Sequence, residues 1–284
     1  MSGPLVQSAP PKEDAQSAWT VKRLGTVVLY GYVGLIIAYL ILPVFIVFPM
    51  SVSPSRFMVF PPAEISWQWY REFFTSSAWL GSTRMSFQVG ISASLIATAL
   101  GTLAAFGIVR ATFRGKSLLY AFLLSPWIMP PIILAISLFF MVSRSGLIGH
   151  WWVVAAAHAV FGIPPVLVIV AASLRSFPQR LEHAAMSLGA DRLTTFRLVT
   201  FPLIRPAVLT GGLFAFLSSF DELLLALYLG GETAVTLPRR IWSGLRFSVN
   251  PTIAAVSSLL ILVGLVLLVV VEVFNRKNAR LRGE

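Results

Sequence analysis

Long stretches without charge alternate with short polar segments along this chain. About 20 apolar residues are enough for a helix to cross the hydrocarbon core of a bilayer. The charge-free windows that enclose 25, 27, 30 and 25 residues lie between Arg84 and Arg110, Lys116 and Arg144, Arg144 and Arg175, and Arg246 and Glu272. A further window, from Leu24 to Ser55, predicts a first transmembrane helix over about Thr26 to Met50. With the apolar run from Ala207 to Leu229, the pattern predicts six transmembrane helices.

This pattern indicates an all-α membrane protein with one six-helix domain over residues 26–275. A polar N-terminal tail over residues 1–25 and a short tail over residues 276–284 flank it. The longest polar segment between the apolar runs is the loop 176–206. Its residues are therefore the most informative about the function of the membrane domain.

Within that loop, the residues from His183 to Pro202 predict a helix, a glycine turn and a second helix. A narrow apolar stripe at helical spacing is formed by Leu181, Ala184, Ala185 and Leu188. Gly189 occupies the place of a helix-ending residue with positive φ, and Asp191 follows as an N-cap. We expect the second helix to end near Phe201, because Pro202 and Pro206 cannot donate backbone hydrogen bonds. An ordinary connecting loop is the alternative interpretation.

Composition and charge support a membrane location. The chain is 57% apolar and 12% charged, whereas a soluble domain carries about 25% charged residues. The net charge of +11 forms no continuous stripe, so it gives no support to a nucleic-acid partner. With the N-terminus inside, 15 of the 22 lysines and arginines lie on inner segments. We therefore expect both termini and the loop 176–206 to be cytoplasmic.

Small residues and prolines mark the places where the helices pack closely or bend. A small-residue face that repeats every four positions in the second helix is formed by Ala93, Ala97, Gly101 and Ala105. Breaks in regular hydrogen bonding are predicted in the third and fourth helices at Pro126, Pro130, Pro131, Gly162, Pro164 and Pro165. These breaks indicate either simple helix kinks or backbone groups that line a water-filled pathway.

Asp221 and Glu222 lie inside the fifth apolar run, where a carboxylate costs about 2.5 to 3.5 kcal/mol on insertion scales. One helical face would then hold Phe214, Leu217, Ser218, Asp221, Leu225 and Tyr228. Such a face suits a cationic solute, whereas a structural ion pair or a helix-end cap is the alternative. Our candidates for a solute pathway are Trp127, Ser218, Ser219, Asp221, Glu222 and Tyr228.

The sequence offers no pattern for catalysis, and we predict no catalytic residue and no metal site. It lacks a GxxxxGK[ST] phosphate loop, a GxSxG elbow and cysteine, and its three histidines form no HExxH pair. An intramembrane enzyme could use Asp221 or Glu222 as acid or base, but no second catalytic cluster lies at matching depth. A structural membrane scaffold is a further alternative.

The polar loop resembles the EAA loop of inner-membrane permeases of binding-protein-dependent ABC importers. That pattern reads E-A-A, three residues, G, nine residues, I-x-L-P. Here the same spacing joins His183-Ala184-Ala185, Gly189 and Val199-Thr200-Phe201-Pro202, with His183 in place of the first glutamate. Glu182 lies one residue earlier, so two side chains are candidates for the acidic position.

The resemblance covers about residues 26–275. SFDELLLALYLGG and TLPRRIWSGLRFSVNPTIAAVSSLLI, which begin at Ser219 and Thr236, are similar to the spermidine/putrescine branch of these permeases. Relatives in that branch serve ferric ion, aminoethylphosphonate and other small solutes. The resemblance implies a type I ABC importer permease fold in a bacterial inner membrane. It also implies a second permease subunit, two ATPase subunits and a periplasmic solute-binding protein as partners.

In such a transporter, ATP and Mg²⁺ are bound by the ATPase subunits and not by the permease chain. The resemblance implies that a coupling helix, about Gln179 to Leu188, docks on an ATPase. Residues implied in this coupling are Glu182, His183, Ala184, Ala185, Leu188, Gly189 and Pro202. The expected activity is inward movement of a small cationic solute, such as a polyamine, by alternating access.

Overall fold

The computed structural model describes residues 12–56, 60–247 and 250–282, and within these ranges the regular structure is helical. The elements in chain order are α1 (Lys12–Ser51), α2 (Gln68–Thr75), α3 (Ser77–Arg110), α4 (Lys116–Ile128), α5 (Pro131–Ser143), α6 (Trp151–Ser176), α7 (Arg180–Ser187), α8 (Arg192–Thr195), the π-helix η1 (Phe196–Thr200), α9 (Phe201–Asp221), α10 (Leu224–Leu229), α11 (Leu237–Phe247) and α12 (Thr252–Arg282).

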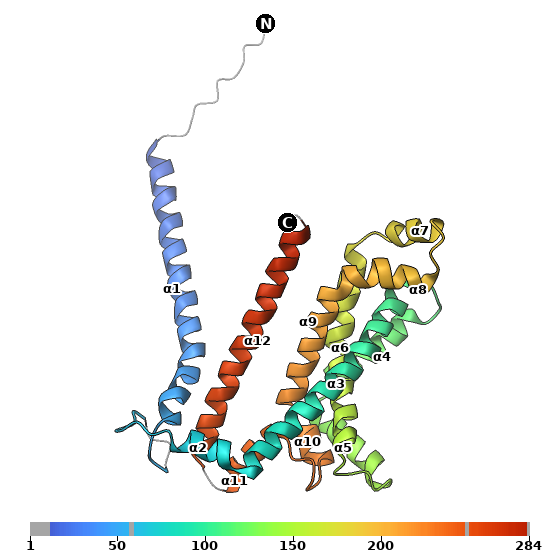
Figure 1. Ribbon diagram of the computed structural model, residues 1–284. Helices are drawn as coiled ribbons and strands as arrows, with labels where there is room; N and C mark the ends of the chain where they lie inside the picture. The colour runs from blue at the N-terminus through green and yellow to red at the C-terminus, as the bar shows by residue number, and fades with distance from the viewer. Residues whose placement is uncertain (1–11, 57–59, 248–249, 283–284) are drawn as a thin grey trace.

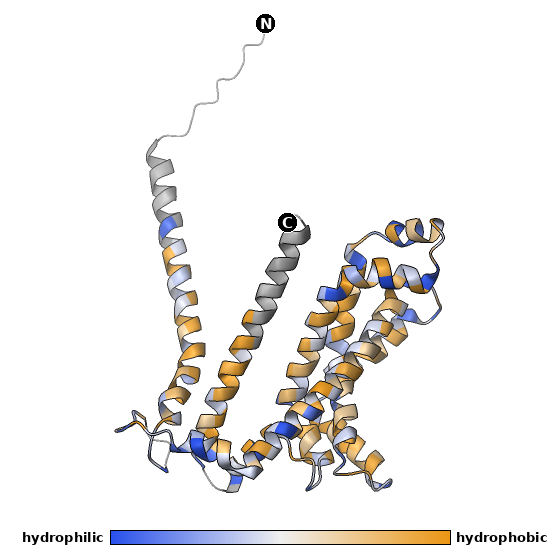
Figure 2. Cartoon of the chain, in the orientation of Figure 1, coloured by the Kyte–Doolittle hydropathy of each residue, from blue (hydrophilic) through white to orange (hydrophobic). Residues whose placement is uncertain are grey.

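Four helical stretches in the described ranges are long and apolar enough to span a bilayer: 25–51, 77–110, 151–176 and 192–221. α4 and α5 together form a further apolar segment, but they meet at an angle of 101°, and α12 contributes the shorter apolar stretch 252–266. Hydrophobic residues cover most of these helices, and polar residues are concentrated at α7, α8 and the connecting loops (Figure 2). The chain is therefore an all-helical membrane protein.

α3, α6 and α9 form the packed centre of the molecule (Figure 1). The small-residue face predicted on α3 is buried here, with Ala97 and Ala105 fully enclosed. A Cβ atom added to Gly162 of α6 would lie 2.8 Å from the Cβ of Ala97 and 3.1 Å from the Cβ of Ala215 in α9. Since real Cβ atoms do not approach so closely, glycine sets the distance between these three helices.

One sequence expectation about the polar loop is wrong. The second helix of the polar loop does not end at Phe201: it continues through η1 into α9, and the Phe201 N–H bonds to the carbonyl of Phe196. Pro202 is the second residue of α9 and follows directly on the π-helical turn η1, where regular i to i−4 hydrogen bonding is already interrupted. The break that the prolines predict in the third expected helix is confirmed at Met129 and Pro130, with α5 starting on Pro131, whereas Pro126 lies inside α4.

The fifth predicted helix is also interrupted. α9 ends at Asp221 and α10 starts at Leu224, so the two carboxylates lie at a helix break. By contrast, α6 passes through Pro164 and Pro165 as one helix. The N-terminal tail expected over residues 1–25 is helical from Lys12 onwards, and residues 1–11 lie outside the described residues; the tail expected over 276–284 continues α12 to Arg282.

The two ends of the molecule differ in what they carry. The start of α1, the end of α12 and the α7–α8 segment lie at one end, as the upper part of Figure 1 shows. α2, α10 and α11 lie at the opposite end. The polar loop thus shares a side with the start of α1 and the end of α12.

We expect Gly162→Ala to lower the stability of the fold by about 1–3 kcal/mol, because overpacking at a close helix contact costs that much. The added methyl group would meet Ala97 and Ala215. Thermal unfolding of the purified protein in detergent measures the change. Gly107→Ala in α3, where nothing lies within 4 Å of the new Cβ atom, is the control and should unfold at or slightly above the wild-type temperature. Equal unfolding temperatures for the two variants would contradict the packing argument.

Candidate functional site

The helix–glycine–helix segment has the local geometry that the sequence predicts. α7 is capped by Leu188, and Gly189 follows with φ of +91°. The carboxylate of Asp191 accepts a 2.8 Å hydrogen bond from the Thr194 N–H and so caps α8. Hydrogen bonding from the Thr194 side chain, together with that from its N–H, lowers the pKa of the Asp191 carboxyl. A helix, a left-handed glycine turn and an N-capped helix are thereby confirmed.

The apolar stripe of α7 is uncovered. Leu188 is 90% exposed and Leu181 is 43% exposed, and Ala184 also lies at the surface. An exposed leucine between small residues costs free energy in water and marks a surface suited to contact with another protein. His183 is exposed on the same short helix.

Glu182 points the other way, into the protein. Its side chain is 9% exposed, and the Nε of Arg110 lies 3.1 Å from both carboxylate oxygens. The Thr200 hydroxyl donates a 3.0 Å hydrogen bond to the same carboxylate, and the Arg110 guanidinium lies 4.7 Å from the Phe177 ring centre. Glu182 therefore ties α7 to the end of α3 and to η1 at the start of α9.

Arg110 and Thr200 were not identified from the sequence. Arg110 served only to mark the end of an apolar window, and Thr200 lies in the EAA-like spacing at a variable position. The sequence gave only a weak signal, a cation at the end of one apolar run and an acid in a later polar loop. Nothing in the spacing showed that they meet across 72 positions of sequence.

The second group of candidates surrounds the break between α9 and α10. The exposed Asp221 lines a cavity of about 370 Å³ together with aromatic rings from three segments. Those rings are Phe87 of α3, Phe216 and Phe220 of α9, and Trp242 of α11. Phe87 and Phe220 pack edge to face with ring centres 5.2 Å apart. This arrangement places one carboxylate on a mostly aromatic and aliphatic wall.

The other pathway candidates do not converge on Asp221. Glu222 accepts hydrogen bonds of 2.8 and 3.1 Å from the N–H groups of Leu224 and Leu225, so it caps α10. Ser219 is buried, and its hydroxyl lies 2.8 Å from Nδ1 of His158 in α6. Tyr228 packs against Phe139 of α5. The helix-end cap considered for these carboxylates is thus what Glu222 forms.

The remaining two candidates are exposed. Trp127 is 56% exposed near the end of α4, and Ser218 lies at the surface of α9. The helical face expected to run from Phe214 to Tyr228 is interrupted, because α9 ends at Asp221 and α10 starts at Leu224. Leu225, expected on that face, is fully buried.

We expect Glu182→Gln to destabilise the protein by about 3–5 kcal/mol, since it leaves the buried Arg110 guanidinium without its countercharge. Thermal unfolding reports the loss. His183→Gln alters the neighbouring, exposed side chain and should leave the unfolding temperature close to that of the wild type. If Glu182→Gln changed the unfolding temperature as little as His183→Gln, the ion pair would not hold α7 against α3.

Comparisons with known proteins agree with this architecture. Residues 97–280 match the family described as binding-protein-dependent transport system inner membrane component. The spermidine/putrescine transport system permease protein PotC of Haemophilus influenzae is 30% identical over 87% of this chain and 96% of its own length. The putrescine transport system permease protein PotI of Escherichia coli (strain K12) is 33% identical over 69% of this chain and 72% of its own.

The fold is similar to that of a bacterial ABC transporter involved in the import of the acidic polysaccharide alginate. The TM-score is 0.69 at 16% identity, with 90% of this chain and 97% of that chain covered. The matching family model spans more than half of the chain, including α6, the polar loop and α9. The chain therefore belongs to the family of binding-protein-dependent transport system inner membrane components, as a multi-pass permease subunit with the type I fold.

Proposed function

We propose that this permease conducts a small cationic solute, a polyamine such as spermidine or putrescine, into the cytoplasm. The observation that carries the proposal is the carboxylate of Asp221 on the wall of an aromatic cavity. An ammonium group is attracted both to a carboxylate and to the faces of aromatic rings. The printed names of PotC and PotI support the same solute class.

The shape and lining of the cavity also suit a polyamine. Its volume of about 370 Å³ lies within the usual range for small-ligand pockets, about 300–1,000 Å³. A polyamine alternates ammonium groups with methylene runs. Leu217, Leu260 and the aromatic rings can take the methylenes, and Asp221 can take one ammonium group. The cavity lies between α9, α11 and α12, so a shift of α9 would change its size.

The fold alone does not select the charge of the solute. The structurally similar alginate transporter takes an acidic polysaccharide, so selection has to come from particular side chains. A single carboxylate in an otherwise apolar wall favours a cation and disfavours an anion such as a phosphonate.

The assembly we propose has a second permease subunit, two ATPase subunits that bind ATP and Mg²⁺, and a periplasmic solute-binding protein. The exposed stripe of α7 supports an ATPase contact, and both termini would lie on that cytoplasmic side. α1 exposes nearly every side chain between residues 25 and 45, which fits contact with lipid and with the second permease.

Movement would pass from α7 to the solute cavity through α9. Glu182 links α7 to Thr200, immediately before α9, and Asp221 is the last residue of α9. A helix is stiff along its axis, so displacement of its first turn by an ATPase moves its far end as well. In this scheme the residues that meet the ATPase are Ala184, Ala185, Leu188 and the exposed His183, whereas Glu182 acts inside the subunit.

Asp221→Asn should raise the KM for polyamine uptake about 10- to 100-fold, the equivalent of losing one hydrogen bond to a charged group. Uptake of labelled spermidine and putrescine into vesicles that hold the complete transporter gives this value. Glu222→Gln is the matched control, because it removes the neighbouring charge while its amide oxygen can still cap α10.

Equal uptake by the Asp221→Asn variant would reject the role of this carboxylate. Wild-type vesicles that take up ferric ion or aminoethylphosphonate but no polyamine would reject the solute class. Solute-dependent chemistry by the purified chain, without an ATPase, would favour an intramembrane enzyme over a transporter.

Gly189→Val should separate ATP hydrolysis from uptake, because valine strains a turn held at φ of +91° and reorients α7. The measurement is the amount of solute moved per ATP hydrolysed. Gly146→Val is the control: its φ is +64°, it also has open space around it, and it lies in the loop between α5 and α6. Both variants should lose stability, but only Gly189→Val should lower the coupling ratio. Unchanged transport and assembly in the Gly189→Val variant would contradict the proposed role of α7 in coupling.

A further inference from the structure

A second pocket lies on the other side of α11 from the Asp221 cavity. It has a volume of about 440 Å³, and its polar lining includes two neighbouring arginines, Arg239 and Arg240. Trp79 of α3 and Asn250, before α12, complete its walls. The pocket is at the end of the molecule opposite α7, since α11 lies there (Figure 1).

Both guanidinium groups are held in place by neutral partners. Nε of Arg240 donates a 2.7 Å hydrogen bond to the hydroxyl of Ser82, a buried residue of α3. Nη1 of Arg239 donates to the carbonyl of Gly231. The Leu237 N–H donates a 2.7 Å hydrogen bond to the Ser86 hydroxyl, which fixes the start of α11 on α3. The arginine side chains are therefore positioned before any partner arrives.

Neither arginine has a countercharge in contact. In the ranges that the structure describes, the only ion pair is the one between Arg110 and Glu182. Burial lowers the pKa of Arg239, and the nearby Glu232 opposes this shift without forming an ion pair. Two half-buried, preorganised guanidinium groups leave several N–H donors for a carboxylate, which accepts from arginine in a bidentate geometry.

We propose that this pocket receives an acidic side chain of the periplasmic solute-binding protein when that protein docks. The inference rests on the proposed function, because a cationic solute would be repelled by Arg239 and Arg240, so the anion must come from the partner. The side of the molecule fits, since α11 lies opposite the ATPase-facing α7. α11 thus borders the Asp221 cavity, whose carboxylate comes from α9, on one face and the arginine-lined pocket on the other.

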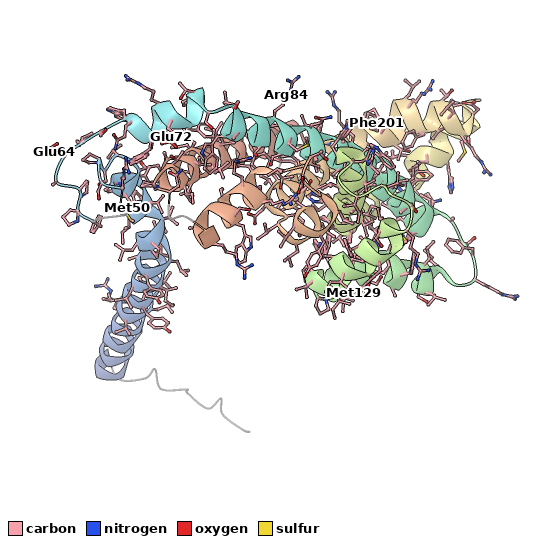
Figure 3. All side chains as sticks on the ribbon, turned by 90° about the horizontal axis from the view of Figure 1, so that it is seen from below. Met50, Glu64, Glu72, Arg84, Met129 and Phe201 are labelled. Carbon is pink, nitrogen blue, oxygen red and sulfur yellow. The ribbon has the colours of Figure 1, made fainter. Side chains whose placement is uncertain are left out.

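The test measures binding of the purified solute-binding protein to the complete transporter in nanodiscs of zwitterionic lipid. Arg240→Gln should weaken binding about tenfold or more and reduce its dependence on salt, as loss of a partly buried charge contact does. Arg84→Gln is the matched control, because it removes the same charge from an exposed residue of α3 that points away from the protein (Figure 3). It should bind almost as tightly as the wild type.

A second set of variants identifies the acidic side chain of the solute-binding protein that the arginines bind. Arg240→Glu should abolish tight binding, and one Asp→Arg or Glu→Arg substitution on the docking face of the solute-binding protein should restore it. Binding by Arg240→Gln equal to the wild type, an equal loss in Arg84→Gln, or the absence of any rescuing substitution would overturn the proposal. If wild-type transporter does not bind the protein at all, the proposed assembly fails, and not only this pocket.

Discussion

The contact between Glu182, Arg110 and Thr200 fixes the relation between the surface helix α7 and the membrane core. A short helix of eight residues has little stability of its own, so its orientation depends on what anchors it. A buried carboxylate provides that anchor only where a cation and a hydroxyl both satisfy it, and here the two come from α3 and η1. The ion pair need not add net stability. Its effect is to leave α7 one favourable position relative to α3 and α9.

That position would be of little use if the core helices could slide independently. α3, α6 and α9 approach so closely at Gly101, Gly162 and Gly211 that side chains of one helix touch the backbone of another. Close packing of this kind favours a few discrete arrangements over continuous deformation. The buried pair of His158 and Ser219 adds a polar link between α6 and α9, two residues before Asp221. The two ends of α9 are thus connected to different neighbours.

Sequence reasoning recovered the features that depend on local chemistry. Gly189 and Asp191 were assigned correctly because a left-handed turn and an N-cap each follow from one residue type. The bounds of the fifth helix were wrong because the break after Asp221 is set by Glu222, whose carboxylate replaces backbone partners for Leu224 and Leu225. Aromatic residues distant in sequence, such as Phe87 and Trp242, join Asp221 only through tertiary packing. No periodicity in one segment could have shown that cavity.

The distribution of charge at the end of the molecule opposite α7 follows from how α11 is attached to α3. Hydrogen bonds to Ser82 and Ser86 fix one face of α11 on α3, and this turns Arg239 and Arg240 toward one pocket and Trp242 toward the other. A cavity that favours a cation and a pocket that favours an anion then lie on opposite sides of the same helix, α11. In the proposed docking, a cation that leaves a carboxylate of the solute-binding protein would meet Asp221, while that carboxylate would meet the arginines. Such an exchange of partners would need no net separation of charge, which would keep its electrostatic cost low.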